Sequence, residues 1–222
     1  MLQVLNHNLL DPSRFVVTLE LVPGTQPAGR KLDTVLEIAK NAFFDGRISA
    51  VSITDNPGGG PALGPNALAY QIFQKGMAVI VHFTCRDMNR GGMECRALQL
   101  AMVGIKNIFA VNGDYISEGF GGQGKPVYDL DSVSLVCMLN MLNKRNKEID
   151  PEEFFIGCAV SPFKQTEAEC VAQYAKMSKK IAAGASYLIT QLGYDARKFD
   201  ELIRIQKELD CSVPTMASLY VL

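Results

Sequence analysis

Residues 78–85 read Ala-Val-Ile-Val-His-Phe-Thr-Cys, a nearly continuous apolar run that ends in polar side chains. An apolar run of this kind, rich in β-branched residues and too short for a helix, favours a strand over residues 78–83 that is buried on both faces. Six similar runs predict further strands, at residues 15–21, 48–53, 107–111, 154–160, 187–189 and 213–216.

Amphipathic segments lie between these runs. One begins with a capping-box pair, Thr166 and Glu169, and then shows apolar residues at the spacing of one helix face: Cys170, Tyr174, Met177 and Ile181. Two more segments show comparable stripes, one made of Leu135, Val136, Leu139 and Leu142, the other of Phe199, Leu202, Ile203 and Leu209. Alternating buried strands and amphipathic helices imply a parallel sheet with right-handed crossovers.

Seven strands, and no glycine fingerprint after the first, favour a parallel β/α (TIM-type) barrel over an open doubly wound sheet. We therefore expect a single barrel domain over residues 1–222 that lacks the last β/α unit, because the chain stops just beyond the seventh strand. Either the chain is a truncated piece of a longer protein, or the barrel is left open or completed by another chain.

Composition narrows the class of protein. A net charge of −1 gives no reason to expect nucleic acid or an anionic membrane as partner. No apolar run approaches the roughly 20 residues of a membrane span, and residues 1–10 lack the pattern of a secretory signal. Six scattered cysteines show no metal-binding spacing, so we interpret them as reduced, buried core residues of a cytoplasmic protein.

Polar residues recur where the predicted strands end, which is where active sites of β/α barrels form. They are Glu20, Thr54, Asp55, His82, Thr84, Cys85, Asp114, Ser161, Thr190 and Gln191. Glu20 interrupts an apolar strand, so partial desolvation should raise its pKa and suit it to general acid catalysis. The alternatives are a buried ion pair for Glu20 with Arg or Lys, and a simple core role for His82.

Two glycine-rich loops are candidate ligand loops. Residues 113–129 form the longest connection, a length typical of lids or ligand loops. Its Gly119-x4-Gly124-Lys125 pattern is not a phosphate loop, because Pro126 stands where Ser or Thr would bind magnesium. The loop at residues 56–60, Asn-Pro-Gly-Gly-Gly, either approaches a ligand through its backbone or is only a turn.

Motifs at the strand ends resemble the methylenetetrahydrofolate reductase family. They occur in the family's order and together cover the whole chain: Thr-Leu-Glu-Leu-Val-Pro at 18–23, Val-Ser-Ile-Thr at 51–54, His-Phe-Thr-Cys at 82–85, Asn-Gly-Asp at 112–114, Gly-Lys-Pro at 124–126 with Tyr128, and residues 180–191 from Lys180 through Ala-Gly-Ala to Ile-Thr-Gln. The resemblance implies a flavin-dependent barrel that reduces 5,10-methylenetetrahydrofolate to 5-methyltetrahydrofolate, in one-carbon metabolism and methionine biosynthesis.

The resemblance also implies roles for individual residues. Glu20 would protonate the folate nitrogen, Asp114 would stabilise the resulting iminium and tune the flavin, and Gln191 would orient the folate. Flavin contacts would come from Thr54, His82, Asn112, Gly113, Asp114, Tyr128 and Lys180, with Lys180 near the cofactor phosphates. The cofactor would be FAD, with FMN as the alternative, and electrons would come from NADH, NADPH or a partner protein.

The chain departs from the family pattern at three places. Asn112 stands where Arg usually precedes Gly-Asp, Asp55 where an aromatic residue often follows Thr, and Val160-Ser161-Pro162-Phe163 where the family has an aromatic-Pro-Glu sequence. These departures leave the flavin type and the electron donor open. The expected partners are a small-molecule folate substrate and either a second copy of the chain, in a homo-oligomer, or a partner redox subunit. The alternative functions are a folate-binding methyltransferase-type barrel and a subunit that receives electrons from a partner.

Overall fold

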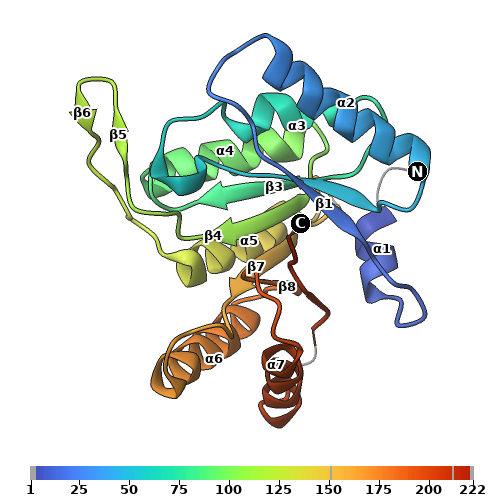
Figure 1. The fold of residues 1–222 in the computed structure, drawn as a ribbon, viewed down its shortest axis with the longest axis vertical. Helices are drawn as coiled ribbons and strands as arrows, with labels where there is room; N and C mark the ends of the chain where they lie inside the picture. Colours follow the sequence, from blue (N-terminus) through green and yellow to red (C-terminus); the bar gives the residue numbers. More distant parts are fainter. Residues whose placement is uncertain (1–3, 151, 212, 221–222) are drawn as a thin grey trace. The chain divides into compact units, whose positions relative to one another are not determined.

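The computed structural model describes residues 4–150, 152–211 and 213–220. These residues form two compact units that meet between Asp131 and Ser132 in the sequence. Each unit repeats a strand followed by a helix (Figure 1). None of the described helices is both long and apolar enough to cross a bilayer.

The first unit contains a four-stranded parallel sheet in the order β1-β2-β3-β4. Its strands are β1 Thr18–Leu21, β2 Ala50–Ile53, β3 Val79–Thr84 and β4 Asn107–Val111. Its helices are α1 Val4–Leu10, α2 Arg30–Asp45, α3 Pro65–Phe73 and α4 Arg90–Met102, with a 3-10 turn at Pro57–Gly59. A hairpin of β5 Glu118–Gly119 and β6 Gly122–Gln123 projects from the loop after β4 (Figure 1).

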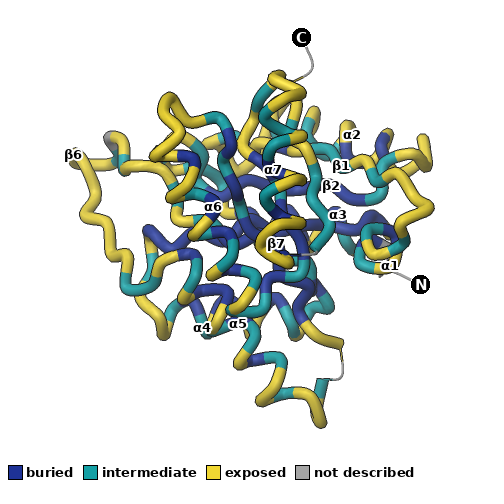
Figure 2. Tube along the Cα trace, turned by 90° about the horizontal axis from the view of Figure 1, so that it is seen from below, coloured by how far each residue is buried: buried dark blue, intermediate teal, exposed yellow. Residues whose placement is uncertain are grey.

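The core of this unit follows from its sequence pattern. Every residue of β2 and β3 is buried, as expected for parallel strands covered on both faces. Helix α3 packs against β2 and β3 and buries Leu68, Ala69 and Ile72 on its inner side. The buried parts of the trace follow the strands, whereas exposed residues line the outer sides of the helices (Figure 2).

The second unit contains the parallel strands β7 Phe155–Val160, β8 Tyr187–Thr190 and β9 Thr215–Met216 in that order. Its helices are α5 Ser132–Asn146, α6 Glu167–Ala182 and α7 Ala196–Glu208. Helices α5 and α6 pack against each other and against β7. The predicted capping box opens α6, where Thr166 and Glu169 exchange both hydrogen bonds.

The predicted parallel β/α fold is confirmed, because all seven predicted strands are present and each described pairing among them is parallel. The single domain over 1–222 stays a prediction. Strand β1 begins at Thr18, later than predicted, because the preceding residues are solvated: the side chain of Phe15 is 94% exposed. Strand β9 is likewise shorter than its apolar run.

Two details of the predicted core are wrong. In α7 only Leu202 of the expected stripe is buried, and Ile203 and Leu209 are exposed. Cys95 and Cys137 are also exposed, although all six cysteines were expected inside. Both thiols lie on helices whose periodicity turns neighbouring positions inward instead, such as Arg96 in α4.

Candidate functional site

The carboxyl ends of β1 to β4 lie at one edge of the first unit's sheet, because neighbouring strands are parallel and paired in register. Glu20 lies in β1, Thr54 follows β2, His82 lies in β3, and Asp114 follows β4. Four residues predicted from sequence therefore come from four adjacent strands of the same unit. This edge is where β/α proteins place their ligand sites.

Glu20 and His82 are predicted site residues from different strands whose side chains lie near each other. Oε2 of Glu20 lies 3.8 Å from Nε2 of His82, and 55% of the Glu20 side chain is exposed. Partial desolvation still raises the pKa of Glu20, as expected for a carboxyl group set in an apolar strand. Among the described residues no Arg or Lys lies within ion-pair distance of Glu20, so the buried ion-pair alternative receives no support.

His82 is a buried histidine with one unsatisfied nitrogen. Its Nε2 has no hydrogen-bond partner among the described residues, and its ring packs edge-on against Phe109 with centroids 4.9 Å apart. Burial lowers the pKa of His82 to about 4, an effect that Asp55 opposes and Arg96 reinforces. The imidazole is therefore neutral at physiological pH, and its buried Nε2 has an unused capacity to form a hydrogen bond.

A buried ion pair fixes the ends of β2 and β3. Nη1 of Arg96 lies 2.6 Å from Oδ2 of Asp55, and less than a tenth of either side chain is exposed. The same carboxylate oxygen accepts hydrogen bonds from the backbone N–H and the hydroxyl of Thr84. Arg96 also donates to the carbonyl of His82 and stacks over the Phe83 ring. Asp55 therefore serves the fold at the position where the family often has an aromatic residue.

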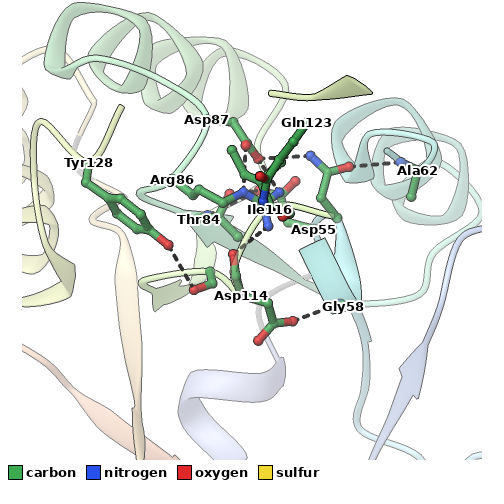
Figure 3. A network of polar contacts seen from close by, with 12 residues as sticks. Asp55, Gly58, Ala62, Thr84, Arg86, Asp87, Asp114, Ile116, Gln123 and Tyr128 are labelled. Carbon is green, nitrogen blue, oxygen red and sulfur yellow. Dashed lines mark hydrogen bonds and ion pairs between the residues drawn. The ribbon is translucent and has the colours of Figure 1, made fainter. Parts of the chain in front are cut away.

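A second arginine, Arg86, joins the loops after β2, β3 and β4 (Figure 3). Its guanidinium donates through Nε and Nη2 to the two oxygens of Asp87, at 2.7 and 2.8 Å, and through Nη1 to the carbonyl of Asp114 at 2.8 Å. Asp87 in turn accepts from Asn56, whose side-chain oxygen accepts from Ala62 N–H. Three loops are thus connected by one chain of hydrogen bonds.

The loop at residues 56–60 makes backbone contacts with the protein itself. Gly58 N–H donates to Oδ2 of Asp114 at 2.8 Å. Gly59 has a φ of 79°, and a Cβ there would lie 1.6 Å from the Tyr115 carbonyl oxygen. Glycine is required at Gly59 by both backbone conformation and close approach. The Asn-Pro-Gly-Gly-Gly sequence is thereby explained as a turn that contacts the loop carrying Asp114.

The remaining predicted residues of the first unit lie around Asp114 and the end of β2. The Thr54 hydroxyl is buried and lies 3.5 Å from the Leu21 carbonyl, and Asn112 is exposed. Gly113 has a φ of 91°. The Tyr128 hydroxyl donates to the Gly113 carbonyl at 3.4 Å, while 39% of Tyr128 remains exposed (Figure 3).

Lys180 and Gln191 belong to the second unit. Gln191 directly follows β8; its backbone N–H donates to the Val160 carbonyl, and its side chain is exposed. Lys180 lies in the last turn of α6, is buried, and donates from Nζ to the Ala159 carbonyl at 2.7 Å. The proposed ligand contacts of both residues stay predictions.

Sequence reasoning missed Arg86, Asp87 and Arg96. Arg86 pairs with Asp114 across 28 positions and Arg96 with Asp55 across 41 positions, so no local spacing reveals either contact. The sequence offered one signal for Arg86 and Asp87. They follow a fully buried strand after a single residue, a position that leaves little room for a long, solvent-exposed side chain.

The fold and these strand-end side chains define a parallel β/α protein with a candidate small-molecule site at the carboxyl edge of its first sheet. The chain belongs to the methylenetetrahydrofolate reductase family, whose sequence profile matches residues 7–221. The family resemblance of the strand-end motifs is thereby confirmed.

Two curated relatives carry the family's name. The chain is 26% identical over 145 residues to a probable methylenetetrahydrofolate reductase (NADPH) of Caenorhabditis elegans, covering 65% of this chain and 20% of that protein. It is 32% identical over 125 residues to the 5,10-methylenetetrahydrofolate reductase of Pectobacterium carotovorum subsp. carotovorum, covering 56% and 37%. The matches thus span well under half the length of either relative.

The fold is shared with solved structures. One is a protein from Clostridium thermocellum described as binding two copies of 5-methyl-5,6,7,8-tetrahydrofolic acid, with a TM-score of 0.61. The alignment covers 96% of this chain and 68% of that protein at 14% sequence identity. At this identity the likeness concerns the fold alone.

Proposed function

We propose that this chain is an oxidoreductase that reduces 5,10-methylenetetrahydrofolate to 5-methyltetrahydrofolate with a bound flavin. The observation that carries the proposal is the pairing of Glu20, a carboxyl group with a raised pKa, with the unsatisfied Nε2 of His82 at the strand ends of a member of this family. A raised carboxyl pKa keeps a proton available nearer neutral pH, as general acid catalysis requires.

The residues of the first unit fit a flavin, because His82 offers a buried nitrogen that lacks a partner. Thr54, Asn112, Gly113, Asp114 and Tyr128 would contribute the other contacts, with Lys180 at the phosphates. When bound, the flavin supplies the hydride that reduces the one-carbon unit. We favour FAD, with FMN as the alternative, and NAD(P)H or a partner protein as electron donor.

The chain's own residues would then supply the proton to the folate and stabilise the positive charge that forms on it. Glu20 donates a proton to the bridging folate nitrogen, so that the ring opens to an iminium. The exposed Asp114 carboxylate, held by Gly58 N–H, stabilises that cation. Gln191 hydrogen-bonds the folate and orients it for transfer.

A folate-binding barrel without a flavin is the second candidate, favoured by the solved relative that binds 5-methyltetrahydrofolic acid. A subunit that receives electrons from a partner protein is a further candidate, favoured by the departures from the family pattern at Asn112, Asp55 and residues 160–163. We also propose a cytoplasmic location, where the six free thiols would stay reduced, and assembly as a homo-oligomer or with a redox partner.

The test is an absorbance spectrum of the purified protein followed by an anaerobic titration. We expect the visible bands of an oxidised flavin, their bleaching on reduction, and their return on addition of 5,10-methylenetetrahydrofolate. A colourless protein that takes up no flavin yet binds folate would replace the reductase by the folate-binding candidate.

A further inference from the structure

Among the described residues of the first unit, Arg86 is the most deeply buried charged residue, with 2% of its side chain exposed. A buried guanidinium is tolerated only where it is paired and hydrogen-bonded. Arg86 meets this condition through its two-pronged contact with Asp87 and its third bond to the Asp114 carbonyl. A ligand has no access to this side chain, so any influence of Arg86 on chemistry acts through the groups that it holds.

Asp114 is held at two points. Arg86 fixes its backbone oxygen, and Gly58 N–H fixes its carboxylate, both at 2.8 Å. The loop that carries Gly58 is attached to the same ion pair, because Asp87 Oδ2 accepts from Asn56 at 3.0 Å. The ion pair of Arg86 and Asp87 is therefore linked to both contacts that hold Asp114, the one to its backbone carbonyl and the one to its carboxylate.

The backbone of Arg86 adds a third connection. Its carbonyl accepts from Val127 N–H at 2.8 Å, directly before Tyr128 in the sequence. The Tyr128 hydroxyl contacts the carbonyl of Gly113, next to Asp114. A Cβ at Gly113 would lie 3.1 Å from the Cβ of Arg86, so the two backbones approach closely. Both ends of the loop over residues 113–128 are thus held near Arg86.

We propose that Arg86 is a positioning residue that holds the Asp114 carboxylate where it can stabilise the folate cation. The proposal rests on the proposed reductase function. Arg86 acts through Asp114 and Asp87 and makes no contact with substrate or cofactor itself. The planar fork of arginine is essential to this role, because a lysine ammonium cannot bond both Asp87 oxygens and the Asp114 carbonyl in the same geometry.

The variant Arg86→Lys tests the proposal in the full chain. We expect the folate half-reaction to slow by about 10- to 100-fold, since small misplacements of a catalytic group have effects of this size. Reduction of the flavin by dithionite should change little. Arg90→Lys is the matched control, because Arg90 makes the same two-pronged contact with Asp129 at an exposed position.

A double-mutant cycle separates positioning from general damage. In an Asp114→Asn background, Arg86→Lys should have almost no further effect on the folate half-reaction. Asp87→Asn, which weakens the ion pair from the other side, should reproduce the effect of Arg86→Lys. Equal slowing of both half-reactions, or effects that multiply fully in the double variant, would overturn the proposal.

Amide hydrogen exchange tests the geometric part independently of any activity. Arg86→Lys should speed exchange in residues 112–117 and 56–62, whereas Arg90→Lys should leave these segments unchanged. Unaltered exchange in Arg86→Lys would reject the positioning role even if the enzyme proves active. A wild-type protein that reduces no folate would reject the proposed function, while the exchange result still decides whether Arg86 positions Asp114.

Discussion

The carboxylate of Glu20 and Nε2 of His82 lie 3.8 Å apart, and the pKa of each group is shifted in the direction that favours its neutral form. Desolvation raises the pKa of the carboxyl group and lowers that of the imidazole. The imidazole is therefore neutral at physiological pH and adds no positive charge beside the carboxyl group.

The first prediction concerns the pH dependence of stability. His82 has a pKa of about 4 in the folded chain, below the ordinary value of 6.5, so between these values the unfolded chain binds more protons. Stability should therefore fall as pH falls from 6.5 towards 4, by on the order of 2–3 kcal/mol from this residue. Urea unfolding of the wild type and of His82→Gln across this range measures the effect. Parallel pH profiles for the two proteins would show that His82 is not its source.

The second prediction concerns the ion pair of Asp55 and Arg96. Arg96→Met would leave a buried carboxylate without its partner and should lower the free energy of unfolding by about 3–5 kcal/mol. Arg90→Met removes an exposed pair with Asp129 and should cost less than about 1 kcal/mol. Urea titrations followed by circular dichroism compare the two variants. Equal small losses would mean that the buried pair contributes no more than the exposed one.

The fold could be predicted because its signals are local. The run at residues 107–111 matches β4 residue for residue, and the pair Thr166 and Glu169 marks the start of α6 through contacts three positions apart. Errors arose where tertiary context overrides local pattern. Ile203 follows the apolar stripe of α7 but lies on its exposed side, and Cys137 lies on the outer side of α5.

The candidate site was predictable only in part. Glu20, His82 and Asp114 could be singled out because a polar residue at the end of an apolar strand is visible in the sequence. The contacts that hold them could not, since Arg86 and Arg96 meet their partners across tens of residues. The sequence also could not decide whether residues 56–60 approach a ligand or form only a turn, because only the structure reveals that Gly58 N–H donates to Asp114.

The third prediction concerns Lys180. If its ammonium reaches the flavin phosphates, Lys180→Ala should weaken flavin binding by about 10- to 100-fold, the value of one charge-assisted hydrogen bond. Lys179→Ala is the control, because Lys179 is the exposed neighbour in the same last turn of α6. Flavin affinity is measured by titrating the apoprotein. A Lys180→Ala protein that is less stable yet binds flavin as tightly would restrict this residue to its contact with Ala159.

The last prediction concerns Glu20 as the acid that opens the folate ring. Glu20→Gln keeps the size and hydrogen bonding of the side chain but cannot supply a proton. General acid catalysis is typically worth about 10² to 10⁴ in rate, so reoxidation of the reduced flavin by 5,10-methylenetetrahydrofolate should slow by that factor. Reduction of the flavin by its electron donor needs no such proton and should continue at nearly the wild-type rate.

The two half-reactions are followed separately by flavin absorbance, with Glu37→Gln on the exposed side of α2 as the control. In the wild type the folate half-reaction should slow as pH rises through the pKa of Glu20, because the protonated carboxyl group is the active form. That dependence should disappear in Glu20→Gln. A structural role would instead lower stability and slow both half-reactions alike. A well-folded Glu20→Gln protein that reduces the folate at the wild-type rate would end the assignment of Glu20 as the acid.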